Sequence, residues 1–248
     1  GEAGDISRMA SVVFDDAAMV QFAALMKNPR KWLESRPQPH SATDFELDTV
    51  ALSRLARSDD RLDAARYIQD RWARWMPKSD LQWVWGQFGL AAALDVDPDA
   101  ARWYRESGFV PMTDFNHAWE VRAELRASPI QWDRVAAAIR KMNGRQADEP
   151  VWRYWYGRAL AAQGNDQAAR QYYESIAGDF GFYGQLATEE LGRTPSLPIT
   201  PAPLDPTWVA QARANPGLER AVALFDLGWR REAVPEWNFT LRGMSDPQ

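Results

Sequence analysis

The sequence predicts an all-α fold, an α-solenoid or superhelix built from antiparallel helix pairs. Over Val151–Gly192, apolar residues recur at spacings of three and four, which is the period of one helix face. A gapless shift of 68 residues sets Phe88–Ser107 against Tyr156–Ser175, with 9 of 20 positions identical. The tetrapeptide Asp-Ala-Ala-Arg at 63–66 recurs 36 residues later, at 99–102. Helices that repeat with a period near 34 to 36 residues indicate stacked helix pairs.

The N-terminal part predicts one long helix and a short one. Ile6–Lys27 carries an apolar stripe and ends at Asn28 and Pro29, because proline lacks an amide proton and cannot continue a helix. Arg30–Glu34 adds a further turn. Arg36–His40 contains two prolines, so we expect a connector there.

Four helix pairs follow. In the second pair, Asp97 is expected to cap the second helix and Pro98 to take its first position. In the fourth, Gly164 ends one helix in the left-handed conformation, and Asn165 or Asp166 accepts hydrogen bonds from the free amides of the next. Paired alanines let neighbouring backbones approach, and most of the 13 tryptophans are expected to act as wedges between helices. The pairs are Asp44–Arg57 with Arg61–Trp75, Asp80–Ala93 with Pro98–Glu106, Asp114–Ala127 with Gln131–Met142, and Glu149–Gln163 with Gln167–Ala177.

The C-terminal part begins with a shorter helix, Gly181–Leu191, that folds back on the fourth pair. Five prolines between residues 194 and 206 predict an extended strap, since each fixes its own φ angle. Three further helices are expected at Thr207–Asn215, Pro216–Leu227 and Arg230–Leu241. The predicted organisation is therefore a superhelical domain over 1–193, a proline-rich strap over 194–206, and the start of a helical linker domain over 207–248.

Composition excludes several classes of protein. A net charge of −5 and a pI near 5.2 argue against a nucleic-acid partner, which requires a positive field. The chain has no cysteine, so disulfides and thiolate ligands are excluded. No run of about twenty apolar residues exists to span a bilayer. Gly1–Asp5 lacks the regions of a signal peptide, so we expect the chain to begin inside a larger protein.

A resemblance to a known family rests on the most regular stretch. Phe182–Gly192 has the sequence FYGQLATEELG, and Trp152–Leu160 precedes it with WRYWYGRAL. This combination resembles the superhelical part of soluble lytic murein transglycosylases. The strap and the helices around Phe225 and Trp237 are similar to the start of that family's linker region. The resemblance covers Asp44–Leu241.

The resemblance implies an activity for a parent enzyme. In that family a periplasmic ring of helices precedes a lysozyme-like catalytic domain, which cleaves the MurNAc–GlcNAc bond of peptidoglycan without water and leaves a 1,6-anhydro end. The implied partners of this chain are peptidoglycan glycan strands and its own missing C-terminal catalytic domain. The implied location is the Gram-negative periplasm, with the signal peptide outside this chain.

The catalytic half is absent from the sequence. The family's active site uses a Glu in an E-S-x-W/F context, followed by G-L-M-Q and A-Y-N-A-G, and neither later motif occurs here. Glu106–Phe109 (ESGF) imitates the first motif. The repeat alignment, however, places Glu106 and Ser107 with Glu174 and Ser175 at the end of a second helix, where a solvated Glu is ordinary. We therefore predict no catalytic residue and an inactive chain.

No metal or cofactor site is predicted. His40 and His117 are the only histidines, stand 77 positions apart, and lack the spacing of metal ligands. Adjacent carboxylates on a helix point about 100° apart, so they suit capping or solvation better than shared chemistry. Such adjacent pairs occur at Asp15-Asp16, Asp59-Asp60 and Glu189-Glu190.

Aromatic and basic clusters allow either packing or murein binding. Core packing explains most of the rings, but five consecutive bulky or charged residues in Trp152–Tyr156 cover every side of a helix, so at least one ring faces a neighbour or a groove. The arginines form a face that is either solvated or meets peptidoglycan carboxylates. The other aromatic clusters are Trp83-Val84-Trp85 and Trp72 with Trp75. The basic face comprises Arg61, Arg66, Arg71 and Arg74.

Two functions follow from this sequence. The first is a non-catalytic helical scaffold fragment of a periplasmic lytic transglycosylase, which positions glycan strands on a curved surface near the catalytic domain. The second is a TPR-like protein-protein adaptor that binds a protein segment and has no link to murein. Both use the same repeats, so architecture alone does not separate them.

Overall fold

The computed structural model describes residues 10–194 and 205–242. Within these ranges all regular secondary structure is helical, and there is no strand. The all-α prediction is confirmed. The chain divides into two compact units, with the division at residues 195 and 196. Among the described helices, none combines the length and hydropathy needed to cross a bilayer.

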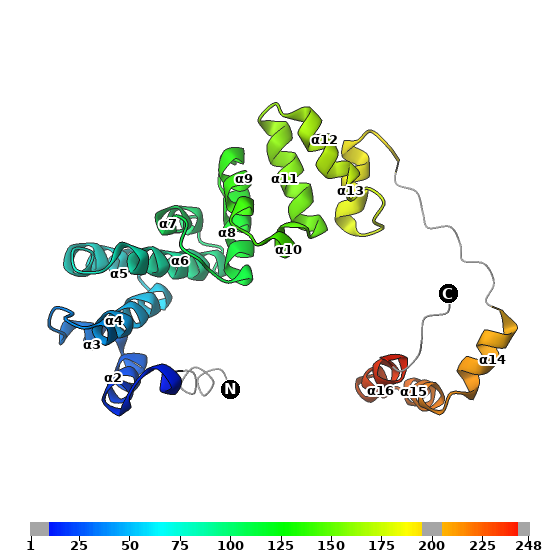
Figure 1. Cartoon of the computed structure of the whole chain (residues 1–248), viewed down its shortest axis with the longest axis horizontal. Helices are drawn as coiled ribbons and strands as arrows, with labels where there is room; N and C mark the ends of the chain where they lie inside the picture. The colour runs from blue at the N-terminus through cyan, green and yellow to red at the C-terminus, as the bar shows by residue number, and fades with distance from the viewer. Residues whose placement is uncertain (1–9, 195–204, 243–248) are drawn as a thin grey trace. The chain divides into compact units, whose positions relative to one another are not determined.

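The first unit is a series of helices in which each packs against its neighbours in sequence (Figure 1). The buried apolar residues of this unit form clusters that follow one another along the chain. Neighbouring clusters are connected because they share a helix. This stepwise packing is that of an α-solenoid. The helices are α2 (Asp16–Lys27), α3 (Pro29–Glu34), α4 (Ala42–Arg54), η1 (Leu55–Arg57), α5 (Arg61–Tyr67), η2 (Ile68–Trp72), α6 (Lys78–Leu94), α7 (Ala100–Ser107), α8 (Asp114–Arg126), α9 (Trp132–Arg140), α10 (Gly144–Ala147), α11 (Pro150–Ala162), α12 (Asp166–Glu174) and α13 (Phe182–Glu190).

The two copies of the sequence repeat form the hairpins α6/α7 and α11/α12, whose helices lie side by side. A glycine sits at the contact in each hairpin. A Cβ on Gly89 would lie 2.7 Å from Cγ of Tyr104, and one on Gly157 would lie 2.6 Å from Cε1 of Tyr173. Both rings are buried. The repeated glycine therefore admits an aromatic ring between two helix axes.

Helix α13 explains the residues of the FYGQLATEELG motif. A Cβ on Gly184 would overlap the carbonyl oxygen of Asp179, so only glycine fits this turn. Thr188 donates its hydroxyl to the carbonyls of Ala177 and Gly184, at 3.0 and 2.9 Å. Gly192 follows with φ of 73°, which ends the helix in the left-handed region. The motif thus fixes the return of the chain onto α11 and α12.

Three expectations about the helices are corrected. The single helix predicted for Ile6–Lys27 is interrupted at Phe14, because the side chain of Asp15 caps a new helix by accepting from the Ala18 amide at 2.8 Å; residues 6–9 lie outside the described ranges. Arg61–Trp75 changes at Ile68 from α5 into a π-helical turn. The short helix α10 was not expected.

The cap of α7 also differs from the prediction. The helix begins at Ala100 with Asp99 at its N-cap, so Pro98 lies before it. Asp97 instead accepts the Asp99 amide at 2.9 Å, in the turn before the helix. The preceding turn itself is the same in both repeat copies, since Val96 has φ of 59° and Gly164, at the equivalent position, has φ of 78°.

The second unit contains α14 (Pro206–Ala214), α15 (Pro216–Asp226) and α16 (Arg230–Arg242). Helices α15 and α16 form a hairpin, held by Arg220, which donates to Glu236 Oε1 at 2.9 and 2.6 Å. These helices lie where the sequence predicted them. The strap predicted for 194–206 lies outside the described residues, apart from its ends.

Candidate functional site

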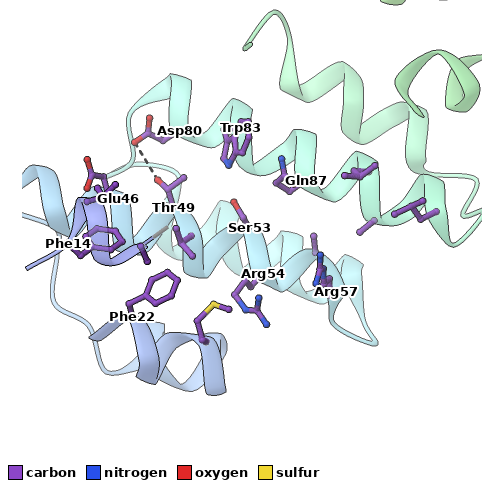
Figure 2. Close-up of a pocket in the computed structure, with 18 residues that line it drawn as sticks. Phe14, Phe22, Glu46, Thr49, Ser53, Arg54, Arg57, Asp80, Trp83 and Gln87 are labelled. Carbon is purple, nitrogen blue, oxygen red and sulfur yellow. Dashed lines mark hydrogen bonds between the residues drawn. The ribbon is translucent and has the colours of Figure 1, made fainter. Parts of the chain in front are cut away.

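The first unit contains a groove with a volume of about 710 Å³ (Figure 2). Residues 10–14, α2, α4, η1 and α6 line it. Its floor is mainly apolar, with Phe22 buried and Phe14 and Trp83 partly exposed. The other apolar lining residues are Ala10, Val13, Met26, Val50, Ala56, Leu90, Ala91 and Leu94.

The polar side chains of the groove come from one stripe of α4 and its extension. Glu46, Thr49, Ser53 and Arg57 follow at spacings of three and four residues, so they share one helix face. The opposite side of α4 is held by Arg36, which donates to Asp44 at 2.6 Å and to the buried Asp48 at 3.4 Å. This anchor directs the polar stripe toward α6.

One end of the groove carries four side chains with hydrogen-bond donors. These are Ser53, Arg54, Arg57 and Gln87, and Figure 2 shows them along the same part of α4 and α6. The Ser53 Oγ and Arg54 Nε atoms are buried and have no hydrogen-bond partner. Burial, together with the neighbouring Arg57, lowers the pKa of the Arg54 guanidinium below its ordinary value. An anion at this end would relieve the repulsion between the two guanidiniums.

The other end of the groove is acidic. Glu46 and Asp80 carry its carboxylates, and Thr49 donates its hydroxyl to Asp80 Oδ2 at 3.4 Å. Within the described ranges, neither carboxylate forms an ion pair, and the same holds for Arg54 and Arg57 at the opposite end. The groove is therefore apolar along its floor, with opposite charges at its two ends.

A smaller hollow of about 340 Å³ lies beside the start of α8. Its wall includes His117 and Lys141, and Lys141 donates to the buried Glu120 at 2.5 Å. His117 Nδ1 lies 3.6 Å from the other oxygen of Glu120. Glu120 neutralises Lys141, and the Asp114 carboxylate in the same wall accepts from the Asn143 amide at 2.6 Å, so this hollow lacks the unpaired arginines of the groove.

The Glu106-Ser107 pair has a structural setting in α7. Glu106 is exposed, while Ser107 is buried and donates its hydroxyl to the Tyr104 carbonyl at 2.7 Å. In the second repeat copy, Ser175 donates to the Tyr172 carbonyl at the same distance of 2.7 Å. The shared Glu-Ser thus ends both helices in the same way.

The structure does not bring the histidines together with other ligands. His40 is exposed and lies before α4, whereas His117 is buried in α8. In 10–194 and 205–242, no group of three or more histidines and carboxylates is placed to hold a metal ion.

Each adjacent carboxylate pair supplies a structural contact. Asp15 caps α2, and Asp60 caps α5 by accepting the Asp63 amide at 2.8 Å. Glu190 pairs with Arg158 at 3.0 Å and accepts from the Tyr154 hydroxyl at 3.2 Å. None of these carboxylates lines the groove.

Of the aromatic candidates, only Trp83 lines the groove. Trp85 stacks on Trp103, with ring centroids 5.5 Å apart, and both are buried. Trp72 and Trp152 are buried as well. These rings are the inter-helix wedges that the repeats predicted.

The basic face is partly neutralised. Arg61 donates to Asp95 at 2.5 Å and to Asp97 at 2.6 Å, and the Arg74 guanidinium lies 4.7 Å from the centroid of the Trp75 ring. Arg66 and Arg71 are exposed. The groove arginines, Arg54 and Arg57, were not singled out from the sequence. Arg57 lies on the polar stripe of residues 46–57, and Arg54 lies next to it. This spacing was the sequence signal that could have identified the two arginines.

The fold is similar to that of three solved structures of lytic transglycosylases. With an inactive mutant of the lytic transglycosylase Slt from Pseudomonas aeruginosa, the TM-score is 0.65 and the identity 26%, over 92% of this chain and 37% of that one. The 70-kDa soluble lytic transglycosylase from Escherichia coli gives 0.64 and 18%, over 98% and 40%. A 70-kDa soluble lytic transglycosylase in complex with bulgecin A gives 0.62 and 19%, over 92% and 36%.

The likeness extends along almost the whole of this chain, which in turn spans well under half of each of those proteins. No family model matches the sequence, and no curated protein matches it. The chain is thus a helical region like that of lytic transglycosylases, as the FYGQLATEELG resemblance indicated.

Proposed function

We propose that this chain is the non-catalytic helical portion of a murein-acting lytic transglycosylase and positions glycan strands for a catalytic domain. Residues 1–193 form the superhelical domain in this proposal, and 207–248 begin the linker domain. The parent enzyme cleaves MurNAc–GlcNAc bonds to 1,6-anhydro products in the periplasm. The chain itself holds the polymer and cleaves nothing.

The observation that carries the proposal is the likeness to the Pseudomonas aeruginosa enzyme over 92% of this chain at 26% identity. The groove between α2, α4 and α6 supports it further, since it offers a partly exposed indole ring, unpaired guanidiniums and unpaired carboxylates. Murein combines a glycan with charged stem peptides, and such a mixed surface suits a polymer of that kind.

Retention on purified sacculi tests the binding part of the proposal. We expect the chain to sediment with insoluble peptidoglycan and to remain soluble without it. A zymogram on the same sacculi tests the non-catalytic part, and no cleared band is expected. Release of anhydro-muropeptides by this chain would contradict the non-catalytic assignment and return attention to Glu106.

The adaptor function remains the second candidate, because the apolar floor of the groove also suits a protein segment. The two candidates differ in their dependence on murein. Loss of sedimentation with sacculi, together with saturable binding of a defined peptide, would favour the adaptor over the scaffold.

A further inference from the structure

We propose that the groove between α2, α4 and α6 is a subsite for the peptide stems of murein rather than for its sugars. The ligand class is a short peptide that carries carboxylates, a free amine and alanine side chains. This inference rests on the proposed function and specifies which part of the polymer the chain recognises.

The basic end selects carboxylates. Arg54 and Arg57 lie one helical turn apart without a carboxylate partner in the described ranges, and the buried Ser53 hydroxyl beside them has no hydrogen-bond partner there either. Charge-assisted hydrogen bonds from guanidinium to carboxylate are the strongest that such donors form. Sugar hydroxyls would leave both guanidinium charges uncompensated.

The acidic end selects an amine. Glu46 and Asp80 have no cationic partner in the part of the chain that the structure describes, and the Thr49 hydroxyl is turned toward Asp80. The diamino acid of a stem peptide supplies a free amine where the stem is not cross-linked. A neutral glycan has no group that matches these carboxylates.

The length of the groove agrees with a stem peptide. Glu46 and Arg57 are eleven residues apart on a nearly continuous helix, which corresponds to about 16 Å at 1.5 Å per residue. An extended peptide of four or five residues spans about 13 to 18 Å. The ligand thus reaches from one charged end to the other with its alanine side chains over the apolar floor.

Sedimentation with two forms of sacculi tests the inference. Intact sacculi carry stem peptides. Amidase removes the stems and, with them, the cross-links, so the treated sacculi are glycan strands coupled to beads, with the lactyl carboxylates that amidase exposes blocked as amides. We expect the wild-type chain to bind intact sacculi about tenfold more tightly than treated sacculi, as charge-assisted hydrogen bonds of ordinary strength provide. Titration with a free stem tetrapeptide provides a second measurement.

Substitutions of arginines inside and outside the groove distinguish binding in the groove from attraction by positive charge anywhere on the surface. The double variant R54Q/R57Q is expected to bind intact sacculi only as weakly as treated ones, and R54K/R57K is expected to recover part of the difference. The matched control R66Q/R71Q removes two exposed arginines outside the groove and is expected to behave as wild type. Thermal melting by circular dichroism verifies that each variant is folded.

The possible results distinguish the two proposals. Equal binding to both forms of sacculi, unaffected by R54Q/R57Q, would overturn the stem-peptide subsite and leave the scaffold function intact. Equal losses in R54Q/R57Q and R66Q/R71Q would also overturn the subsite, because charge alone would then explain binding. No sedimentation with either form would overturn the scaffold function itself. Tighter binding of an acidic amphipathic helix than of the stem tetrapeptide would assign the groove to a protein segment.

Discussion

Two aspartates on α4 share Arg36 and should affect stability in opposite directions. Asp48 is fully buried, its Oδ2 has no hydrogen-bond partner, and burial raises the pKa of its carboxyl to about 6. Asp44 is more exposed and accepts from Arg36 at 2.6 Å, and this hydrogen bond lowers the pKa of its carboxyl to about 2. Comparing the stabilities of Asp48→Asn and Asp44→Asn therefore separates the cost of burying a carboxylate from the gain of pairing one with Arg36.

The sign for Asp48 follows from proton linkage. Because the folded chain holds this proton more tightly than the unfolded chain, the free energy of unfolding falls as pH rises from about 4 to about 6. The difference between a pKa of about 6 and the ordinary 3.8 corresponds to about 3 kcal/mol above pH 7. Asn has the shape of the aspartate side chain without its charge, and Arg36 keeps its ion pair with Asp44. We expect Asp48→Asn to stabilise the protein at pH 7 by about 1 to 3 kcal/mol.

Asp44 has the opposite linkage. Its contribution is present above pH 4 and is lost as pH falls toward 2, because the folded chain binds its proton less tightly than the unfolded chain. Asp44→Asn should therefore lower stability at pH 7. Asn keeps an oxygen that can accept the Ser41 amide in the capping box at the start of α4, so the loss comes from the charge beside Arg36.

Urea unfolding from pH 4 to pH 8, followed by circular dichroism, measures both effects. The wild-type free energy of unfolding should show the decline attributed to Asp48 between pH 4 and 6, and Asp48→Asn should remove that part of the slope. The argument would be refuted if the Asp48→Asn variant were less stable than wild type at pH 7 and the free energy of unfolding changed with pH as it does in wild type. It would show that the Arg36 attraction outweighs the burial of the carboxylate.

Other contacts give narrower predictions. Gly157→Ala should lower stability by about 1 to 2 kcal/mol, since the new methyl meets the Tyr173 ring and the gain in helix propensity offsets only part of this strain. Gly144→Ala, which meets nothing within 4 Å, is the control and should change stability by less than about 0.5 kcal/mol in urea unfolding. Ser107→Ala should cost about 1 kcal/mol through its lost hydroxyl bond to Tyr104, as thermal melts can measure. Glu106→Gln should leave sacculus retention and melting temperature unchanged, and a large loss of either would contradict its solvated setting.

Much of the fold could be predicted because its determinants are local. Helix breaks at Gly164 and Gly192 coincide with positive φ angles, and the apolar spacing over Val151–Gly192 indicated buried positions such as Trp152 and Tyr173. The repeat identity predicted equivalent hairpins. It did not predict that Gly89 contacts Tyr104, whereas Gly157 contacts Tyr173, which is one position later in the aligned repeat. The two second helices also begin at different aligned positions, since α7 begins at Ala100, two residues later in the repeat than α12 at Asp166.

The candidate site was largely inaccessible to sequence reasoning. The groove forms where residues 10–14, α2, α4 and α6 meet, and these segments are up to 84 positions apart. Of its lining, the sequence indicated only Trp83 as an aromatic candidate. Of the arginines singled out from their spacing, Arg61 is instead neutralised by carboxylates from the turn after α6. Whether an arginine is paired depends on tertiary contacts that spacing along one helix does not contain.

Those ion pairs also explain how similar helices keep a defined register. Alanine-rich faces resemble one another, so a slide of one turn between neighbours changes little apolar burial. A slide would, however, leave a buried carboxylate without its partner, at a cost of about 3 to 5 kcal/mol. Pairs with a buried carboxylate connect elements of the first unit: Arg36 with Asp48, Arg105 with Glu124, and Lys141 with Glu120. Arg61 with Asp97 and Arg158 with Glu190 are more exposed pairs and contribute less.

The groove depends on this register. Its charged ends are set by the position of the 46–57 stripe of α4 against α6, and Arg36 holds α4 from the opposite side. The burial of Asp48, which Arg36 compensates only in part, is therefore a local cost that favours one placement of the helix over its alternatives. On this argument Asp48→Asn gains stability at pH 7 and relaxes the specificity of helix pairing. Binding at Arg54 and Arg57 would then weaken even as the melting temperature rises.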